Sequence, residues 1–232
     1  MKVAIISAMP EELRPVLDQI QIISEEKFGI PQRFILGKYK NMELVLCVGG
    51  IGKVNASIST TRLIEKYNPD IFIMIGVAGA LNPNLKIGDI VIAKDGVYHD
   101  VDVTPLGYKI GEVPETGIIW KGDEVLVNKF FDICENYLKE KKAFVGRIAS
   151  GDQFIADKER AKKIRETFKA DAIEMESAAF YHTLNLYGKK GVVLRAISDT
   201  ADEKANIDFP TFLNEVSQIF KDIIFKYLNT YG

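Results

Sequence analysis

Residues 191–198 read GVVLRAIS, a composition typical of a buried β-strand. Short runs of β-branched residues bounded by Gly, Asn or Asp are common in strands that are covered on both faces of a sheet. Further stretches share this composition: 2–7, 43–48, 71–75, 87–93, 143–149 and the short 171–173. We therefore predict a sheet whose strands are spread over the whole chain.

Segments with helical periodicity separate these strands. They are residues 54–67, 125–138, 158–168, 177–186 and a last segment that follows Pro210 and ends near Leu228. Strands that alternate with helices indicate a largely parallel sheet with helices on both faces. We predict an α/β fold with a mixed, mostly parallel central sheet flanked by helices. No linker or repeat divides the chain, so residues 1–232 should form a single domain.

Residues 94–120 show no clear periodicity and contain six glycine and proline residues. This composition predicts a long excursion from the sheet. Loops of this length within a compact domain are commonly functional.

Composition narrows the class of protein. Hydrophobic residues make up 47% of the chain and charged residues 27%, as in ordinary globular proteins. The formal net charge is −2 and the basic residues form no stripe, which favours a small ligand over nucleic acid. Cys47 and Cys134 lie among apolar residues, and no apolar run approaches about eighteen residues. We predict buried thiols, no membrane contact and a cytoplasmic location.

Two glycine motifs and one polar cluster are incomplete as ligand sites. The GGIGK sequence at 49–53 lacks the first glycine and the hydroxyl residue of a phosphate loop, so it predicts a tight turn leading into a helix. The GVAG sequence at 76–79 lacks the third glycine of a dinucleotide fingerprint. His99, Asp100 and Asp102 could be metal ligands, but the chain has only two histidines, and we predict no metal site.

Acidic residues follow three of the predicted strands. Glu11 and Glu12 follow the first strand, Glu174 and Glu176 follow a short one, and Asp199 follows the last. The carboxyl ends of parallel strands meet at one edge of a sheet, where open α/β folds bind ligands. Taken singly, Glu12 and Glu176 could complement a helix N-terminus and Asp199 could be an N-cap. Together, beside glycine-rich strand ends, they predict a binding cleft.

Carboxylates in this arrangement suit the cleavage of a glycosidic bond. The reaction passes through an oxocarbenium-like state, so a general acid assists the leaving group and a general base delivers water. A third acid can hold sugar hydroxyls. The pattern alone assigns none of these roles and does not choose between Glu11 and Glu12.

Eight motifs lie along the chain in a fixed order: MPEE (9–12), GGIGK (49–53), GVAG (76–79), KIGDIV (86–91), YHDVDVT (98–104), SGDQFI (150–155), EME (174–176) and RAISDTAD (195–202). In sequence and order they resemble the bacterial 5′-methylthioadenosine/S-adenosylhomocysteine nucleosidases of the nucleoside phosphorylase superfamily. The resemblance implies a nucleoside phosphorylase-like fold and a hydrolase that releases adenine from a 5′-thio-substituted riboside. It also implies that the protein is a homodimer, that it binds a nucleoside and that it needs no cofactor.

The same resemblance implies roles for individual residues. Glu12 would activate the attacking water, and Asp199 would protonate adenine at N7. Glu176 would bind the ribose hydroxyls, with Met175 packed on the sugar. The other substrate contacts would be Val77, Ala78 and Gly79 on the ribose side, Phe154, Ile155 and Phe209 around adenine, and Ser198 beside the acid. His99 has no proton to move in this scheme and stays outside the site.

The 5′ substituent would lie in an apolar pocket partly built by the partner subunit, from Val103, Leu106 and Tyr108. Leu106 replaces an aromatic residue common at its position, and Val77 replaces a serine found in some members. The Leu106 difference leaves open which 5′ groups are preferred. The Val77 difference leaves open whether one polar contact near the ribose is made.

Three other functions stay open. A nucleoside phosphorylase would have the same fold, but such enzymes place glycine and arginine after the first strand to bind phosphate, where this chain has MPEE. A nucleoside-binding module without catalysis would need no base to activate water. A hydrolase of aminofutalosine would keep the chemistry and change the substrate.

Overall fold

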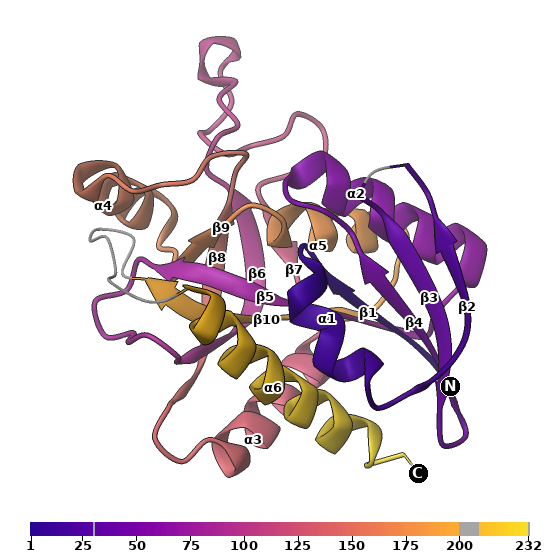
Figure 1. The fold of residues 1–232 in the computed structure, drawn as a ribbon. Helices are drawn as coiled ribbons and strands as arrows, with labels where there is room; N and C mark the ends of the chain where they lie inside the picture. The colour runs from indigo at the N-terminus through magenta and orange to yellow at the C-terminus, as the bar shows by residue number, and fades with distance from the viewer. Residues whose placement is uncertain (30, 200–208, 232) are drawn as a thin grey trace.

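The computed structural model describes residues 1–29, 31–199 and 209–231. Within these ranges ten strands form one mixed sheet with helices packed against it (Figure 1). The strands are β1 (Lys2–Ser7), β2 (Gln21–Lys27), β3 (Arg33–Tyr39), β4 (Met42–Val48), β5 (Ile71–Ala80), β6 (Ile90–Tyr98), β7 (Ile119–Lys121), β8 (Ala143–Ser150), β9 (Ala172–Glu174) and β10 (Gly191–Asp199). The helices are α1 (Pro10–Leu17), α2 (Lys53–Arg62), η1 (Leu63–Tyr67), η2 (Thr104–Leu106), α3 (Glu124–Tyr137), α4 (Lys158–Phe168), α5 (Ser177–Leu186) and α6 (Phe209–Leu228).

Five strands close into a ring. β5 pairs with β10, β10 with β6, β6 with β8, β8 with β9, and β9 returns to β5. From β5 the sheet continues through β1, β4 and β3 to β2. The α/β class and the mixed sheet are therefore confirmed. Much of the antiparallel pairing comes from β2, β3 and β7, which the sequence patterns did not predict.

Helices cover both faces of the sheet. Val3 and Ile5 of β1 pack in one core with α1, α3 and α6, while Ala4 and Ile6 pack in a second core with α2 and α5. This alternation follows from the two-residue period of a strand. Figure 1 shows α1 beside α6 on one side and α2 beside α5 on the other. No helix in the described ranges is long and apolar enough to cross a membrane.

The excursion from the sheet is shorter than predicted. The expectation that it begins at residue 94 was wrong, because β6 continues to Tyr98 through a bulge between Ala93 and Asp95. Gly96, which suggested a loop, lies inside the strand, and a Cβ at this position would lie 2.9 Å from the Cα of Ala178. The glycine is needed for the close packing of α5 on β6.

Candidate active site

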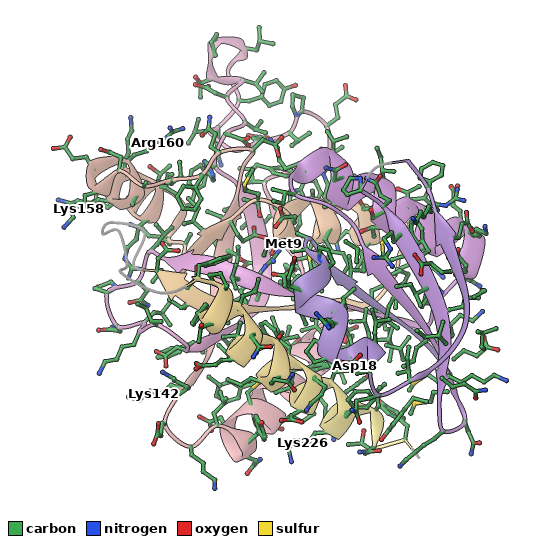
Figure 2. All side chains as sticks on the ribbon, viewed as in Figure 1. Met9, Asp18, Lys142, Lys158, Arg160 and Lys226 are labelled. Atoms are coloured by element: carbon green, nitrogen blue, oxygen red, sulfur yellow. The ribbon has the colours of Figure 1, made fainter. Side chains whose placement is uncertain are left out.

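A cleft of about 190 Å³ lies where β1, β5 and β10 end. Eleven residues predicted for the site line it: Glu12, Val77, Ala78, Gly79, Phe154, Ile155, Met175, Glu176, Ser198, Asp199 and Phe209. Met9, a further lining residue, is labelled at the N-terminal end of α1 (Figure 2). The structure thus brings together side chains that lie up to about two hundred positions apart in the chain.

The strand directions at the cleft differ from the predicted ones. β9, which carries Glu174, runs antiparallel to β5, so the strands do not all point the same way. β9 is only three residues long, and Glu176 follows it as the N-cap residue of α5. The acid therefore reaches the cleft from the beginning of a helix.

Val103, Leu106 and Tyr108 do not line the cleft of their own chain. They lie on the excursion between β6 and β7, where Leu106 is 74% exposed. An exposed apolar residue at this place is available for contact with a second molecule.

Seven lining residues had no predicted role in substrate binding or catalysis: Ala8, Met9, Ile51, Gln153, Ile173, Glu174 and Arg195. Arg195 had a signal in the sequence, since it is the single charged residue within the apolar stretch 191–198. A charged residue in a fully buried strand needs a charged partner. The structure provides one in Glu174.

Glu12 is held at the beginning of α1. Its Oε2 accepts a hydrogen bond from the backbone N–H of Met9 at 3.0 Å, as in a capping box. The side chain is only 1% exposed, and burial raises the pKa of Glu12 to about 7, against the opposing effects of the Met9 N–H and Arg195. Glu11 is exposed and does not line the cleft. The structure thus separates two glutamates that the pattern could not.

Arg195 lies at the centre of a buried charge cluster. Its Nη2 pairs with Glu174 and lies 3.3 Å from Oε2 of Glu176. Burial lowers the pKa of Arg195, but Glu174, Glu176 and Glu12 outweigh it and raise the pKa overall. A Cβ at Gly76 would lie 1.9 Å from Nη1 of Arg195, so only glycine leaves room for the guanidinium.

Glu174 caps α5 from inside the protein. Its carboxylate accepts hydrogen bonds from the backbone N–H groups of Glu176, at 3.0 Å, and Ser177, at 2.9 Å. The hydroxyls of Ser150 and Ser177 also donate to it. Because Glu174 satisfies the helix end, Glu176 does not have to.

Glu176 is instead held by the GGIGK turn. Its Oε1 accepts the backbone N–H of Gly52 at 2.8 Å, and the side chain is buried. Gly52 has a φ of 99°, a conformation that favours glycine. Burial and then the neighbouring Glu174 carboxylate raise the pKa of Glu176. The predicted turn into a helix is confirmed, and this turn also supports the cleft.

Polar contacts anchor the same turn from outside. The backbone N–H of Lys53 donates to Asp152 at 2.8 Å, and Lys53 Nζ pairs with Asp100 at 2.6 Å. Asp100 in turn accepts the backbone N–H of Asp152 at 2.9 Å. Asp100 therefore has a structural partner, and His99 is not among the residues that line the cleft. No group of three or more His, Cys, Asp or Glu residues within the described ranges could hold a metal ion.

Asp199 is the last residue of β10, which is separated in the sheet by β5 from β1, the strand that precedes α1. Ser198 Oγ lies 2.7 Å from Oδ2 of Asp199, which fixes the orientation of the carboxyl group. The alternative role of Asp199 as an N-cap depends on residues 200–208, which lie outside the described residues, as do the last three positions of the RAISDTAD motif.

These features define an α/β protein with a cleft lined by buried carboxylates where its strands end, and the sequence comparisons identify its family. The chain belongs to the phosphorylase superfamily, whose family model matches residues 2–229.

Within this superfamily several similar proteins are nucleosidases. A 5′-methylthioadenosine/S-adenosylhomocysteine nucleosidase of Staphylococcus haemolyticus is 40% identical over 96% of both chains. An aminodeoxyfutalosine nucleosidase of Campylobacter jejuni is 38% identical over 97% of both. The crystal structure of a 5′-methylthioadenosine/S-adenosylhomocysteine nucleosidase of Campylobacter jejuni superposes with a TM-score of 0.90, at 38% identity and 97% coverage of both chains.

Proposed function

We propose that this protein hydrolyses the N-glycosidic bond of 5′-methylthioadenosine and S-adenosylhomocysteine, releasing adenine and the 5-thio-substituted ribose. The observation that carries the proposal is Glu12, a buried carboxyl group in the wall of a small cleft with a pKa of about 7. Such a group can take a proton from water near neutral pH. The names of the similar proteins indicate the substrates.

Water, and not phosphate, is the nucleophile in this proposal. The carboxylate of Glu12 repels a phosphate ion at the place where the attack begins. Arg195, a cation in the cleft wall, is already paired with Glu174 and Glu176. The described part of the cleft therefore favours hydrolysis over phosphorolysis.

Asp199 acts as the general acid in this scheme. It donates a proton to N7 of adenine as the bond to C1′ lengthens, because adenine leaves poorly as an anion. Ser198, 2.7 Å from the carboxyl group, orients it. Glu12 lies on α1 and Asp199 on β10. Because they come from different elements, one can activate the water while the other protonates the leaving group.

Glu176 binds the ribose 2′- and 3′-hydroxyls, and Met175 packs on the sugar. One carboxylate oxygen of Glu176 is fixed by Gly52, so the side chain is oriented before substrate arrives. Val77, Ala78 and Gly79, at the end of β5, line the ribose side.

Phe154 and Phe209 hold the adenine at the mouth of the cleft, where they are 81% and 43% exposed, and the buried Ile155 lies behind them. Exposed aromatic rings at a pocket mouth lose water contact when a flat base stacks on them. Their exposure therefore supports this role.

The protein also acts as a homodimer in this proposal, with Val103, Leu106 and Tyr108 of one subunit completing the 5′ pocket of the other. Val54 and Ile58, spaced by one turn on α2, are exposed, as is Ile51 at the cleft. Sedimentation velocity of Leu106→Glu should show a shift towards monomer, together with a raised KM. A parent protein that sediments as a monomer at micromolar concentration would contradict the dimer.

The function is tested by the release of free adenine from purified protein. Adenine should appear at the same rate with and without phosphate, together with the free thio-ribose. Phosphate-dependent turnover would establish a phosphorylase, and substrate binding without adenine release would establish a binding module.

A cytoplasmic location is also part of this proposal. Two buried free thiols, Cys47 and Cys134, support it, because disulfides are rare in the cytosol.

A second candidate substrate is aminodeoxyfutalosine, because the similar protein of Campylobacter jejuni is named for it. A direct comparison of kcat/KM on the three nucleosides assigns the substrate. We expect the two thio-substituted nucleosides to be preferred.

A further inference from the structure

A second groove, of about 490 Å³, runs between α1 and α6 next to the catalytic cleft. Met9 and Phe209 line both spaces, so these two side chains form a common wall. Met9 precedes α1 and Asp18 follows it, and Figure 2 labels both, at opposite ends of that helix. The groove therefore extends from the cleft along the whole length of α1.

Three charged side chains line the α1 side of this groove. Glu11, Arg14 and Asp18 are spaced by three and four residues, which places them on one face of the helix. All three are exposed. None of these three side chains has a hydrogen bond or ion pair with another described residue, although Arg14 and Asp18 are at a spacing that often forms one.

The α6 side of the groove is neutral. Asn214 and Gln218 lie one turn apart and offer amide groups, while Phe209, Pro210 and Leu213 form an apolar wall nearer the cleft. A ligand that fits this groove has an apolar stem beside Met9 and Phe209. Its head carries both a negative group for Arg14 and a positive group for Glu11 or Asp18.

We propose that the groove is the subsite for the amino-acid tail of S-adenosylhomocysteine, with Arg14 binding the α-carboxylate and Glu11 or Asp18 the α-ammonium group. This inference rests on the proposed function, because it takes the nucleoside to occupy the catalytic cleft. The thioether chain leaves the 5′ pocket past Met9 and Phe209, which line both the cleft and the groove. 5′-Methylthioadenosine, which ends in a methyl group, stops at this wall and does not reach Arg14.

The groove then determines the preference between two substrates that share one reaction. A carboxylate that pairs with an arginine gains a charge-assisted hydrogen bond that a methyl group cannot make. The site is open to water, so the gain is modest compared with that in a buried pair. It should appear in KM for the larger substrate, because the tail is remote from the bond that breaks.

The test compares Arg14→Gln and Arg14→Glu with the parent enzyme on both substrates. The ratio of kcat/KM for S-adenosylhomocysteine to that for 5′-methylthioadenosine should fall about threefold in Arg14→Gln, as expected for an exposed ion pair, and further in Arg14→Glu. The control is Lys129→Gln, on the exposed face of α3 and away from the groove. It changes the net charge by the same amount as Arg14→Gln and should leave the ratio unchanged. Melting temperatures check that each variant is folded.

Two synthetic substrates separate the charges of the tail. One replaces the homocysteine tail with a carboxypropyl group and the other with an aminopropyl group. Arg14→Gln should weaken only the first, while the double variant Glu11→Gln, Asp18→Asn should weaken only the second. A loss of both substrates alike in Arg14→Gln would indicate a structural effect and overturn the subsite.

The outcomes distinguish the subsite from the proposed function. If the parent enzyme releases adenine from both natural substrates and Arg14→Glu changes their ratio by less than about twofold, the subsite is wrong and the proposed function stands. If the parent releases adenine from neither, the proposed function fails and the subsite fails with it.

Discussion

The two faces of α1 carry the same kind of residue in opposite surroundings. Glu12 faces the catalytic cleft, is 1% exposed and has a pKa raised to about 7 by burial. Glu11 precedes it in the chain, faces the outer groove and is exposed. One step along a helix therefore separates a group suited to proton transfer from one suited to binding a cation. Burial, more than residue type, decides the chemistry of a carboxylate.

The largest effect expected from this comparison is that of Glu12→Gln. Removal of a general base should lower kcat for 5′-methylthioadenosine by at least about a hundredfold while ligand binding persists. Glu11→Gln should have a milder effect on the same substrate. Adenine release and isothermal titration with a substrate analogue measure the two properties. A larger loss from Glu11→Gln than from Glu12→Gln would reverse the assignment of the base.

Asp199→Asn should cause a loss of the same order, at least about a hundredfold in turnover, because asparagine can accept the Ser198 hydroxyl but has no proton to transfer. Asparagine caps a helix about as well as aspartate, so an N-cap role predicts that activity survives. A substrate with carbon in place of N7 should be a poor substrate for the parent enzyme. If Asp199→Asn is nearly fully active, the acid lies elsewhere; Asp202, the next candidate, lies outside the described residues.

The pH dependence of the parent enzyme tests the surroundings of Glu12. Its carboxyl group must be ionised to accept a proton, and its pKa is about 7. We expect kcat/KM to fall about tenfold per pH unit below that value, because each unit lowers the ionised fraction tenfold. A profile that stays flat down to about pH 5 would show that the base is not a carboxyl group with a raised pKa, and would contradict the assignment of Glu12.

Glu176 extends the comparison to a second buried carboxylate. The parent enzyme should prefer ribosides to 2′-deoxyribosides by about tenfold or more, because a deoxyriboside loses a hydrogen bond to the buried carboxylate of Glu176. Glu176→Gln should weaken that preference. Rates on matched ribosides and deoxyribosides measure it, and equal rates in the parent would exclude this role.

The smallest expected effect concerns stability. Because the pKa of Glu12 is raised in the folded state, folding favours its protonated form, and stability falls as the pH rises from the ordinary glutamate value to about 7. Above that pH the full cost of the buried charge is present. Glu12→Gln should therefore melt a few degrees higher than the parent at pH 8, with a smaller difference at pH 5. Equal differences at both pH values would contradict the raised pKa.

The sequence predicted those elements whose pattern matches their burial. The helices 158–168 and 177–186 and the strand 2–7 begin and end as expected. β2 was missed because nearly all of its side chains are exposed and charged residues interrupt it, so it lacks a buried face. α1 was missed because Pro10 and Pro15 obscure its period, although a proline is allowed in the first turn.

For the site, the sequence predicted which strand ends come together. The sequence could not show that the Glu174 carboxylate caps α5 and pairs with Arg195. These interactions depend on contacts between β9, α5 and β10. It also could not distinguish Glu11 from Glu12, since the distinction arises from the packing of α1 against α6 and the sheet.

β10 has a consequence for how the protein is made. Its nine residues close the strand ring by pairing with β5 and β6, both about a hundred residues earlier in the chain, and they carry Arg195, Ser198 and Asp199. During synthesis the N-terminal part of a chain leaves the ribosome first. Until residue 199 has emerged, the ring is open and neither the buried cation nor the acid is in place. Such late, long-range closure slows folding, and a growing chain gains its catalytic cleft only in the last part of translation.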